Sequence, residues 1–154
     1  MLTHGSQSCG ASPSTQIVIV FFLVVSIAMS TDGILSNTGT DVTFEEMKRL
    51  SDMGAMNLID VREPAELAKD GAIPSAVNIP LGQFKDTLRL SPSELQALHG
   101  LAVQGQDSEI IVSCRSGRRS TLAAAMAREL GYTNVRNYAG GILEWNAKIN
   151  PNGS

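Results

Sequence analysis

Short apolar runs alternate along the chain with amphipathic stretches that carry helix start and stop signals. The apolar runs predict buried strands, and the spacing of apolar residues between them predicts helices. The expected strands are residues 41–43, 57–61, 76–79, 109–113 and 134–138. The expected helices are residues 44–53, 64–69, 91–99, 118–130 and 141–149, with 81–90 as a mixed connection. This alternation indicates an α/β fold with a mostly parallel, five-stranded sheet.

Three residues whose side chains could take part in catalysis or binding lie at the ends of predicted strands. Cys114 follows the strand at 109–113, and Asp60 and Arg62 lie at the end of the strand at 57–61. In sheets of this kind, ligands bind beyond the carboxyl ends of the strands. The topology therefore predicts that these three residues share one edge of the sheet.

Cys114 opens a short loop that leads into the helix predicted at 118–130. Unpaired backbone N–H groups converge at a helix N-terminus, and the helix dipole favours an anion there. Arg115, Arg118 and Arg119 strengthen the same positive field. A cysteine in this position ionises more easily, which predicts a nucleophilic thiolate that handles an anionic substrate. The alternative is a buried structural thiol, and the flanking arginines and glycine argue against it.

The length of this loop separates two chemistries. One is phosphoryl transfer, in which an arginine at the end of the loop clamps the phosphate, and the other is sulfur transfer with a loop one residue shorter. Here Arg119 stands five positions after Cys114, and Ser120 occupies the sixth position. The shorter loop forms a smaller cradle, which suits a sulfur atom or a sulfonate edge better than a tetrahedral phosphoryl group.

Four segments in a fixed order resemble the rhodanese family. Residues 114–119 fit its active-loop pattern Cys-Arg-x-Gly-x-Arg/Thr, and residues 58–63 are similar to its Asp-Val-Arg segment. Residues 71–80 are similar to Gly-x-Ile-x-Gly-Ala-x-Asn-Ile-Pro, with Ser75 where the family often has glycine. Residues 138–145 match the closing Gly-Gly-x-x-x-Trp signature. The resemblance implies a single rhodanese-like domain with helices on both faces of the sheet.

The resemblance implies a thiosulfate sulfurtransferase that works by ping-pong sulfur transfer and needs no cofactor or metal. Cys114 would take the sulfane sulfur of thiosulfate or a persulfide and pass it to cyanide, glutathione, thioredoxin or another protein thiol. The residues expected to bind substrate are those of the loop, namely Arg115, Ser116, Gly117, Arg118, Arg119 and Ser120. Arg115 and Arg119 are expected to pair with the donor dianion, whereas Arg118 either does the same or faces water.

Supporting roles are assigned to Asp60 and Arg62. Asp60 either orients the loop, caps a helix or pairs with Arg62, while Arg62 and Glu63 are expected to form an ion pair at the surface. The Gly140-Gly141 pair is expected to allow a close backbone approach, and Trp145 is expected to cover the core.

The N-terminal part of the chain is a different kind of sequence, because no Asp, Glu, Lys or Arg precedes Asp32. Residues 17–29 form an apolar run, short for a membrane span of about 20 residues but typical of a secretory h-region of about 7–15. The expected organisation is a targeting segment at 1–30, a linker at 31–39, the domain at 40–149 and a tail at 150–154. Three alternatives stay open: a cleaved export signal, an uncleaved membrane anchor, and a cytoplasmic or mitochondrial protein that starts at Met29.

Composition excludes other classes of function. A chain of 154 residues with 43% hydrophobic residues suits one domain with a substantial core. The net charge of −3 and the lack of a basic tract argue against a nucleic-acid partner. The two cysteines, Cys9 and Cys114, have no histidines at ligand spacing, which excludes a structural zinc site.

Three hypotheses for the domain follow from these observations. The first is a sulfurtransferase, and the second is a non-catalytic binding module or sulfur carrier that a partner enzyme loads. The third is a cysteine phosphatase or arsenate reductase of related fold. The short loop counts against the third, as does Ser113, which stands directly before the cysteine where such phosphatases have histidine.

Overall fold

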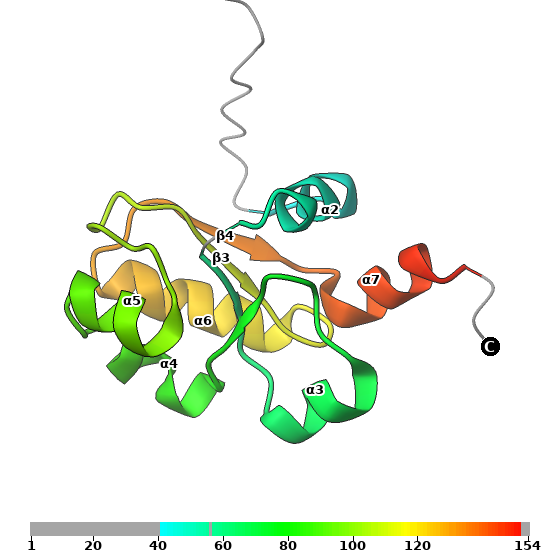
Figure 1. Ribbon diagram of the computed structural model, residues 1–154, viewed down its shortest axis with the longest axis horizontal. Coiled ribbons are helices and arrows are strands. Elements are labelled where there is room, and N and C mark those ends of the chain that lie inside the picture. Colours follow the sequence, from blue (N-terminus) through cyan, green and yellow to red (C-terminus); the bar gives the residue numbers. More distant parts are fainter. Residues whose placement is uncertain (1–40, 56, 152–154) are drawn as a thin grey trace, which may run out of the picture. The chain divides into compact units, whose positions relative to one another are not determined.

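The chain folds around a parallel four-stranded sheet in a computed structural model that describes residues 41–55 and 57–151 (Figure 1). The strands are β1 (Leu58–Asp60), β2 (Val77–Asn78), β3 (Ile110–Ser113) and β4 (Val135–Tyr138). The helices are α2 (Phe44–Asp52), α3 (Pro64–Asp70), α4 (Leu81–Thr87), α5 (Pro92–His99), α6 (Arg118–Glu129) and α7 (Gly141–Ile149). The strand order is β2-β1-β3-β4, which places β1 and β3 in the middle of the sheet.

Two apolar clusters cover the two faces of this sheet. Successive side chains of a strand point to opposite faces, so Ile59 packs against helices α4, α5 and α6 while Leu58 packs against α2 and α7. In Figure 1 the α4, α5 and α6 ribbons gather on one side of the strands and α2 lies on the other. Both faces of the sheet are therefore buried, as expected for a parallel sheet. The predicted α/β fold with helices on both faces is confirmed.

Helix α6 packs on the sheet through small side chains. Ala123, Ala124 and Ala127 form its buried face, and they allow the helix backbone to lie close to the strands. The helix starts at Gly117 and stops before Gly131, both of which have positive φ values. This close packing fixes the direction in which the first turn of α6 meets the end of β3.

The structure corrects two details of the expected elements. Residues 41–43 do not form a fifth strand, because only an isolated parallel bridge joins Asp41 to Asn137. Thr43 already caps α2 by accepting a hydrogen bond from the Glu46 N–H, so the extended segment ends before a ladder can form. The mixed connection expected at 81–90 contains helix α4, because Phe84 and Leu88 are spaced to bury one face of it.

The N-terminal expectations fall on residues 1–40, outside the part of the chain that the structure describes. Within residues 41–55 and 57–151, no helix is long and apolar enough to cross a lipid bilayer.

Candidate functional site

Cys114 lies directly after β3 and before the first turn of α6. Its parent strand has neighbours on both sides, since Ser113 pairs with Asp60 of β1 and with Tyr138 of β4. Cys114 is only 1% exposed, and it lies at the carboxyl edge of the parallel sheet where this fold class binds ligands. The loop is therefore anchored by one of the two central strands of the sheet.

Two donors point at the Cys114 sulfur. The Gly117 N–H donates to Sγ at 3.2 Å, and the Ser120 hydroxyl lies 3.5 Å from the same atom. The Ser120 hydroxyl also lies 3.0 Å from the Gly117 carbonyl oxygen. A hydroxyl has one proton to donate, so these two acceptors compete for it. A negative charge on sulfur would draw that proton toward Sγ.

The pKa of the Cys114 thiol is lowered from its ordinary value. Burial is the largest single influence and raises the pKa, because it disfavours the thiolate. The Ser120 hydroxyl and the backbone N–H groups of Ser116, Arg119 and Ser120 act against it. Together these hydrogen bonds outweigh the burial, which favours the nucleophilic form of the sulfur.

Gly117 allows the loop to turn back over the sulfur. Its φ of 88° lies in the left-handed region that side chains disfavour. A Cβ atom at this position would also lie 2.5 Å from the Ala139 carbonyl oxygen. Two independent constraints therefore require glycine here, and they explain why the loop N–H groups can converge on one point.

A second glycine brings helix α7 against the back of the loop. Gly141 has a φ of 57°, and a Cβ on it would lie 2.4 Å from the Cys114 carbonyl oxygen. The Ile142 N–H donates to that oxygen at 3.0 Å, and the Leu143 N–H donates to the Arg115 carbonyl at 3.2 Å. The close approach predicted for the glycine pair is thus present, and it is made to the cysteine loop itself. Trp145, 6% exposed, packs in the core below as expected.

The three loop arginines have different surroundings. Arg119 donates two hydrogen bonds to the Glu66 carboxylate, at 2.5 and 2.7 Å. These bonds lower the pKa of Glu66 to about 2. The Arg115 Nε lies 3.7 Å from a carboxylate oxygen of Asp70, a much weaker contact. Arg118 forms no hydrogen bond or ion pair with the part of the chain that the structure describes.

Asp60 and Arg62 form a buried ion pair below the edge of the site. The Arg62 guanidinium donates to both carboxylate oxygens of Asp60 at 2.7–3.0 Å and to the Gly71 carbonyl at 2.8 Å. The Asn78 amide donates to the carbonyl oxygens of both residues. Of the roles considered for Asp60, pairing with Arg62 is the one present.

The expected surface ion pair of Arg62 with Glu63 is wrong, because Arg62 is 0% exposed. Its charge is compensated inside the protein by Asp60, although its Nη1 atom is buried without a hydrogen-bond partner in the described structure. Among the described residues, no hydrogen bond joins Asp60 or Arg62 directly to the cysteine loop. Both residues support the end of β1, and neither contacts the sulfur.

An open pocket of about 340 Å³ lies over the sulfur. It is lined by Cys114, Arg115, Ser116, Arg118, Arg119 and Leu122. The loop thus supplies both the reactive sulfur and the positive charge of one cavity, as the sequence predicted. Leu122, which is 50% exposed, adds an apolar wall that the sequence did not indicate.

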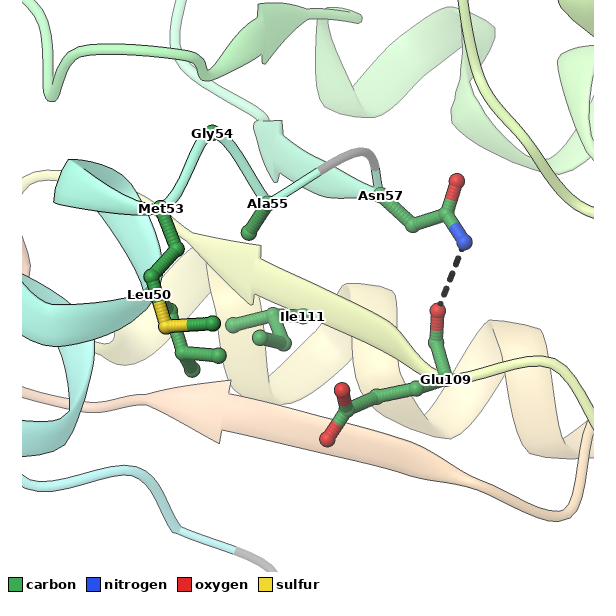
Figure 2. Close-up of a pocket in the computed structure, with 7 residues that line it drawn as sticks. All are labelled: Leu50, Met53, Gly54, Ala55, Asn57, Glu109 and Ile111. Carbon is green, nitrogen blue, oxygen red and sulfur yellow. Dashed lines mark hydrogen bonds between the residues drawn. The ribbon is translucent and has the colours of Figure 1, made fainter.

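A second pocket lies at the opposite end of the strands (Figure 2). It has a volume of about 220 Å³ and is lined by Leu50, Met53, Gly54, Ala55, Asn57, Glu109 and Ile111. The Asn57 side-chain N–H donates to the Glu109 carbonyl at 3.0 Å, whereas the Asn57 Oδ1 is buried without a hydrogen-bond partner in the described structure. None of its lining residues is a nucleophile, and the candidate functional site is therefore the Cys114 pocket. No group of His, Cys, Asp and Glu that could hold a metal ion occurs in the described parts of the chain.

Sequence reasoning missed the two carboxylates that face the loop. Glu66 and Asp70 are four residues apart on α3, so they lie on the same face of that helix. Helix α3 follows β1, whose end lies beside the cysteine loop. The sequence did contain a signal for these two carboxylates, because Glu66 and Asp70 form an acidic i, i+4 pair shortly after the Asp-Val-Arg segment.

Comparison with known proteins identifies relatives of this arrangement. The sequence model described as Rhodanese-like domain matches residues 43–148. Thiosulfate:glutathione sulfurtransferase of Homo sapiens is 38% identical over 105 residues, which are 68% of this chain and 90% of that protein. Thiosulfate sulfurtransferase RDL2, mitochondrial, of Saccharomyces cerevisiae is 40% identical over 91 residues, 59% of this chain. That match spans 60% of the yeast protein, which is less than two thirds of its length.

A solved structure supports the same grouping. The human single-domain sulfurtransferase TSTD1 has a TM-score of 0.63 and 37% sequence identity, and the alignment covers 71% of this chain and 97% of that one. The resemblance predicted from four short motifs is confirmed by a match over the whole described domain.

Proposed function

The chain belongs to the rhodanese family, and on that premise we propose that it is a thiosulfate sulfurtransferase in which Cys114 carries the sulfur as a persulfide. One observation carries the proposal: the Cys114 sulfur lies in a positively charged pocket with the Gly117 N–H at 3.2 Å and the Ser120 hydroxyl at 3.5 Å. Such donors stabilise an anionic sulfur.

The first half-reaction loads the enzyme. The Cys114 thiolate attacks the outer sulfur of thiosulfate, and a new sulfur–sulfur bond forms. The sulfur–sulfur bond inside thiosulfate breaks, and its electron pair leaves on sulfite. The lowered pKa of Cys114 makes the attacking thiolate easier to form than that of an ordinary cysteine. The Gly117 N–H and the Ser120 hydroxyl lie within reach of Sγ, where they would stabilise the attacking thiolate.

The second half-reaction transfers the sulfur from the enzyme to the acceptor. An acceptor thiolate attacks the outer sulfur of the persulfide, and the electron pair of the broken bond returns to Cys114. With glutathione the product is glutathione persulfide, and with cyanide it is thiocyanate. Glutathione is the acceptor that we favour, because the human relative is named for it and is 38% identical to this chain. A protein thiol such as thioredoxin is the alternative acceptor.

The site gives less support to phosphoryl transfer. A phosphatase needs an arginine that clamps the transferred group, and the arginine that ends this loop, Arg119, is bound to Glu66 through two hydrogen bonds. A sulfur carrier loaded by a partner needs the same persulfide, and sulfite release from thiosulfate distinguishes an enzyme from such a carrier.

Steady-state assays separate these functions. We expect sulfite release from thiosulfate in the presence of glutathione, and no release with the Cys114→Ser variant. A carrier would release no sulfite from thiosulfate but would accept sulfur from a small persulfide donor. Hydrolysis of p-nitrophenyl phosphate that depends on Cys114, without sulfite release, would refute the proposal in favour of the phosphatase.

A further inference from the structure

Two carboxylates of helix α3 contact two of the three loop arginines and leave the third without a partner in the described chain. Glu66 holds Arg119 in a two-bond pair in which the two side chains are about one third exposed, at 28% and 31%. Asp70 lies beside Arg115 at 3.7 Å, although the Arg115 side chain is 54% exposed. Arg118 has no such partner in the described chain and lines the Cys114 pocket. Three arginines therefore line the pocket. Arg119 is paired with Glu66, Arg115 is in weak contact with Asp70, and Arg118 has no partner among the described residues.

This division changes the charge that a substrate meets. The Arg119 guanidinium already uses its Nη1–Nη2 edge for the Glu66 carboxylate, so one of the two paired donor edges with which arginine recognises oxyanions is occupied. The Arg119 guanidinium still adds positive potential close to itself, but the adjacent Glu66 charge cancels most of it at distances larger than the separation of the two charges. The guanidinium of Arg118 keeps all its donors for a ligand in the pocket.

We infer that Glu66 determines how the site binds its anionic donor, because it withdraws Arg119 and leaves Arg118 as the main contact for the donor's sulfonate oxygens. This inference rests on the proposed function, since the anion in question is thiosulfate. It differs from the expectation from the sequence, which gave the donor to Arg115 and Arg119 and left open whether Arg118 binds it or faces water. Glu66 is a positioning residue here, because it acts on the substrate only through Arg119.

Binding to a protein that cannot turn over tests the inference. Thiosulfate is titrated calorimetrically into the full-length Cys114→Ser variant at low ionic strength. Adding Arg118→Gln should raise the Kd about tenfold, because one charge-assisted contact is lost. Adding the pair Glu66→Gln and Arg119→Gln should leave the Kd within about threefold, because both charges disappear together.

Recovery of thiosulfate affinity in a double variant shows whether Glu66 acts by positioning Arg119 or only supports the fold. In the Arg118→Gln background, adding Glu66→Gln releases Arg119 and should recover most of the lost affinity. With Cys114 present, the same variants should change the KM for thiosulfate and leave kcat nearly constant. Thermal unfolding of each variant shows whether the domain stays folded, and Arg118→Lys, which keeps the charge, provides a conservative comparison.

Three results would overturn the inference: an unchanged Kd in Arg118→Gln, no rescue by Glu66→Gln, or no thiosulfate binding by the Cys114→Ser protein. Failure of the proposed function is a separate result, because it would appear as absent sulfite release in the parent protein. The binding titration does not depend on that release.

Discussion

The backbone N–H of Ile142 donates a hydrogen bond of 3.0 Å to the carbonyl oxygen of Cys114. The next N–H of α7, that of Leu143, does the same for Arg115. These N–H groups belong to the first turn of α7, where they have no acceptor within their own helix. A trans peptide directs its C=O and N–H to opposite sides, so holding the Cys114 and Arg115 carbonyls on α7 also fixes the directions of the Arg115 and Ser116 N–H groups in the loop.

Gly141→Ala tests this support directly. A Cβ there would lie 2.4 Å from the Cys114 carbonyl oxygen and 2.5 Å from that of Arg115, so the loop or α7 must move. We expect lower stability and a large loss of sulfur transfer, measured by chemical unfolding and sulfite release. Gly100→Ala is the matched control, because Gly100 has a φ of 71° with nothing within 4 Å.

The control variant isolates the backbone cost, which is about 1–2 kcal/mol for a left-handed residue. Gly100→Ala should show that cost alone and keep its activity. If Gly141→Ala loses no more stability than Gly100→Ala and retains full turnover, α7 does not position the loop.

Ser120→Ala should raise the pKa of Cys114. The Ser120 hydroxyl is the largest influence that favours the thiolate, so its loss should shift the acidic limb of the kcat/KM profile to higher pH. Activity rises with pH as the thiol ionises, so the variant should be slower at neutral pH and approach the parent rate in alkaline solution.

Ser113→Ala is the control for this prediction. Its hydroxyl is buried and has no hydrogen-bond partner in the described structure. Its removal should therefore leave the pH profile unchanged and should not lower the stability of the domain. Equal shifts in the two serine variants would show that the pH profile reports general damage to the loop rather than the Ser120 hydrogen bond.

Asp60→Asn should destabilise the domain by about 3–5 kcal/mol, because it leaves the buried Arg62 guanidinium without a compensating charge. The measurement is urea unfolding at neutral pH. Asp86→Asn removes one partner of an exposed ion pair, with side chains 83% and 58% exposed, and should have almost no effect. Similar losses in both variants would contradict the structural role given to the Asp60–Arg62 pair.

The sequence predicted the parts of the site that depend on local pattern. The apolar run before Cys114, the loop glycine and the helical spacing after it together indicated a strand, a turn and a helix start. The close approach of Gly141 could also be expected, because a glycine pair before a helix allows a backbone contact that other residues prevent.

Contacts between distant segments could not be predicted in the same way. Arg119 and Glu66 are 53 positions apart, and their pairing depends on how α3 packs beside the loop. Arginine is usually exposed, so nothing in the sequence around Arg62 indicates a fully buried guanidinium. Helix α4 was missed because Gly82 is a weak helix former and conceals the spacing of Phe84 and Leu88.

Intact-mass analysis after incubation with thiosulfate tests the central claim, that Cys114 carries the transferred sulfur. The account predicts a gain of a single sulfur atom, which disappears when cyanide is added and is absent in Cys114→Ser. Cys9→Ser, which removes the other cysteine of the chain, should keep the gain. No gain in the parent protein, or an equal gain in Cys114→Ser, would contradict the account.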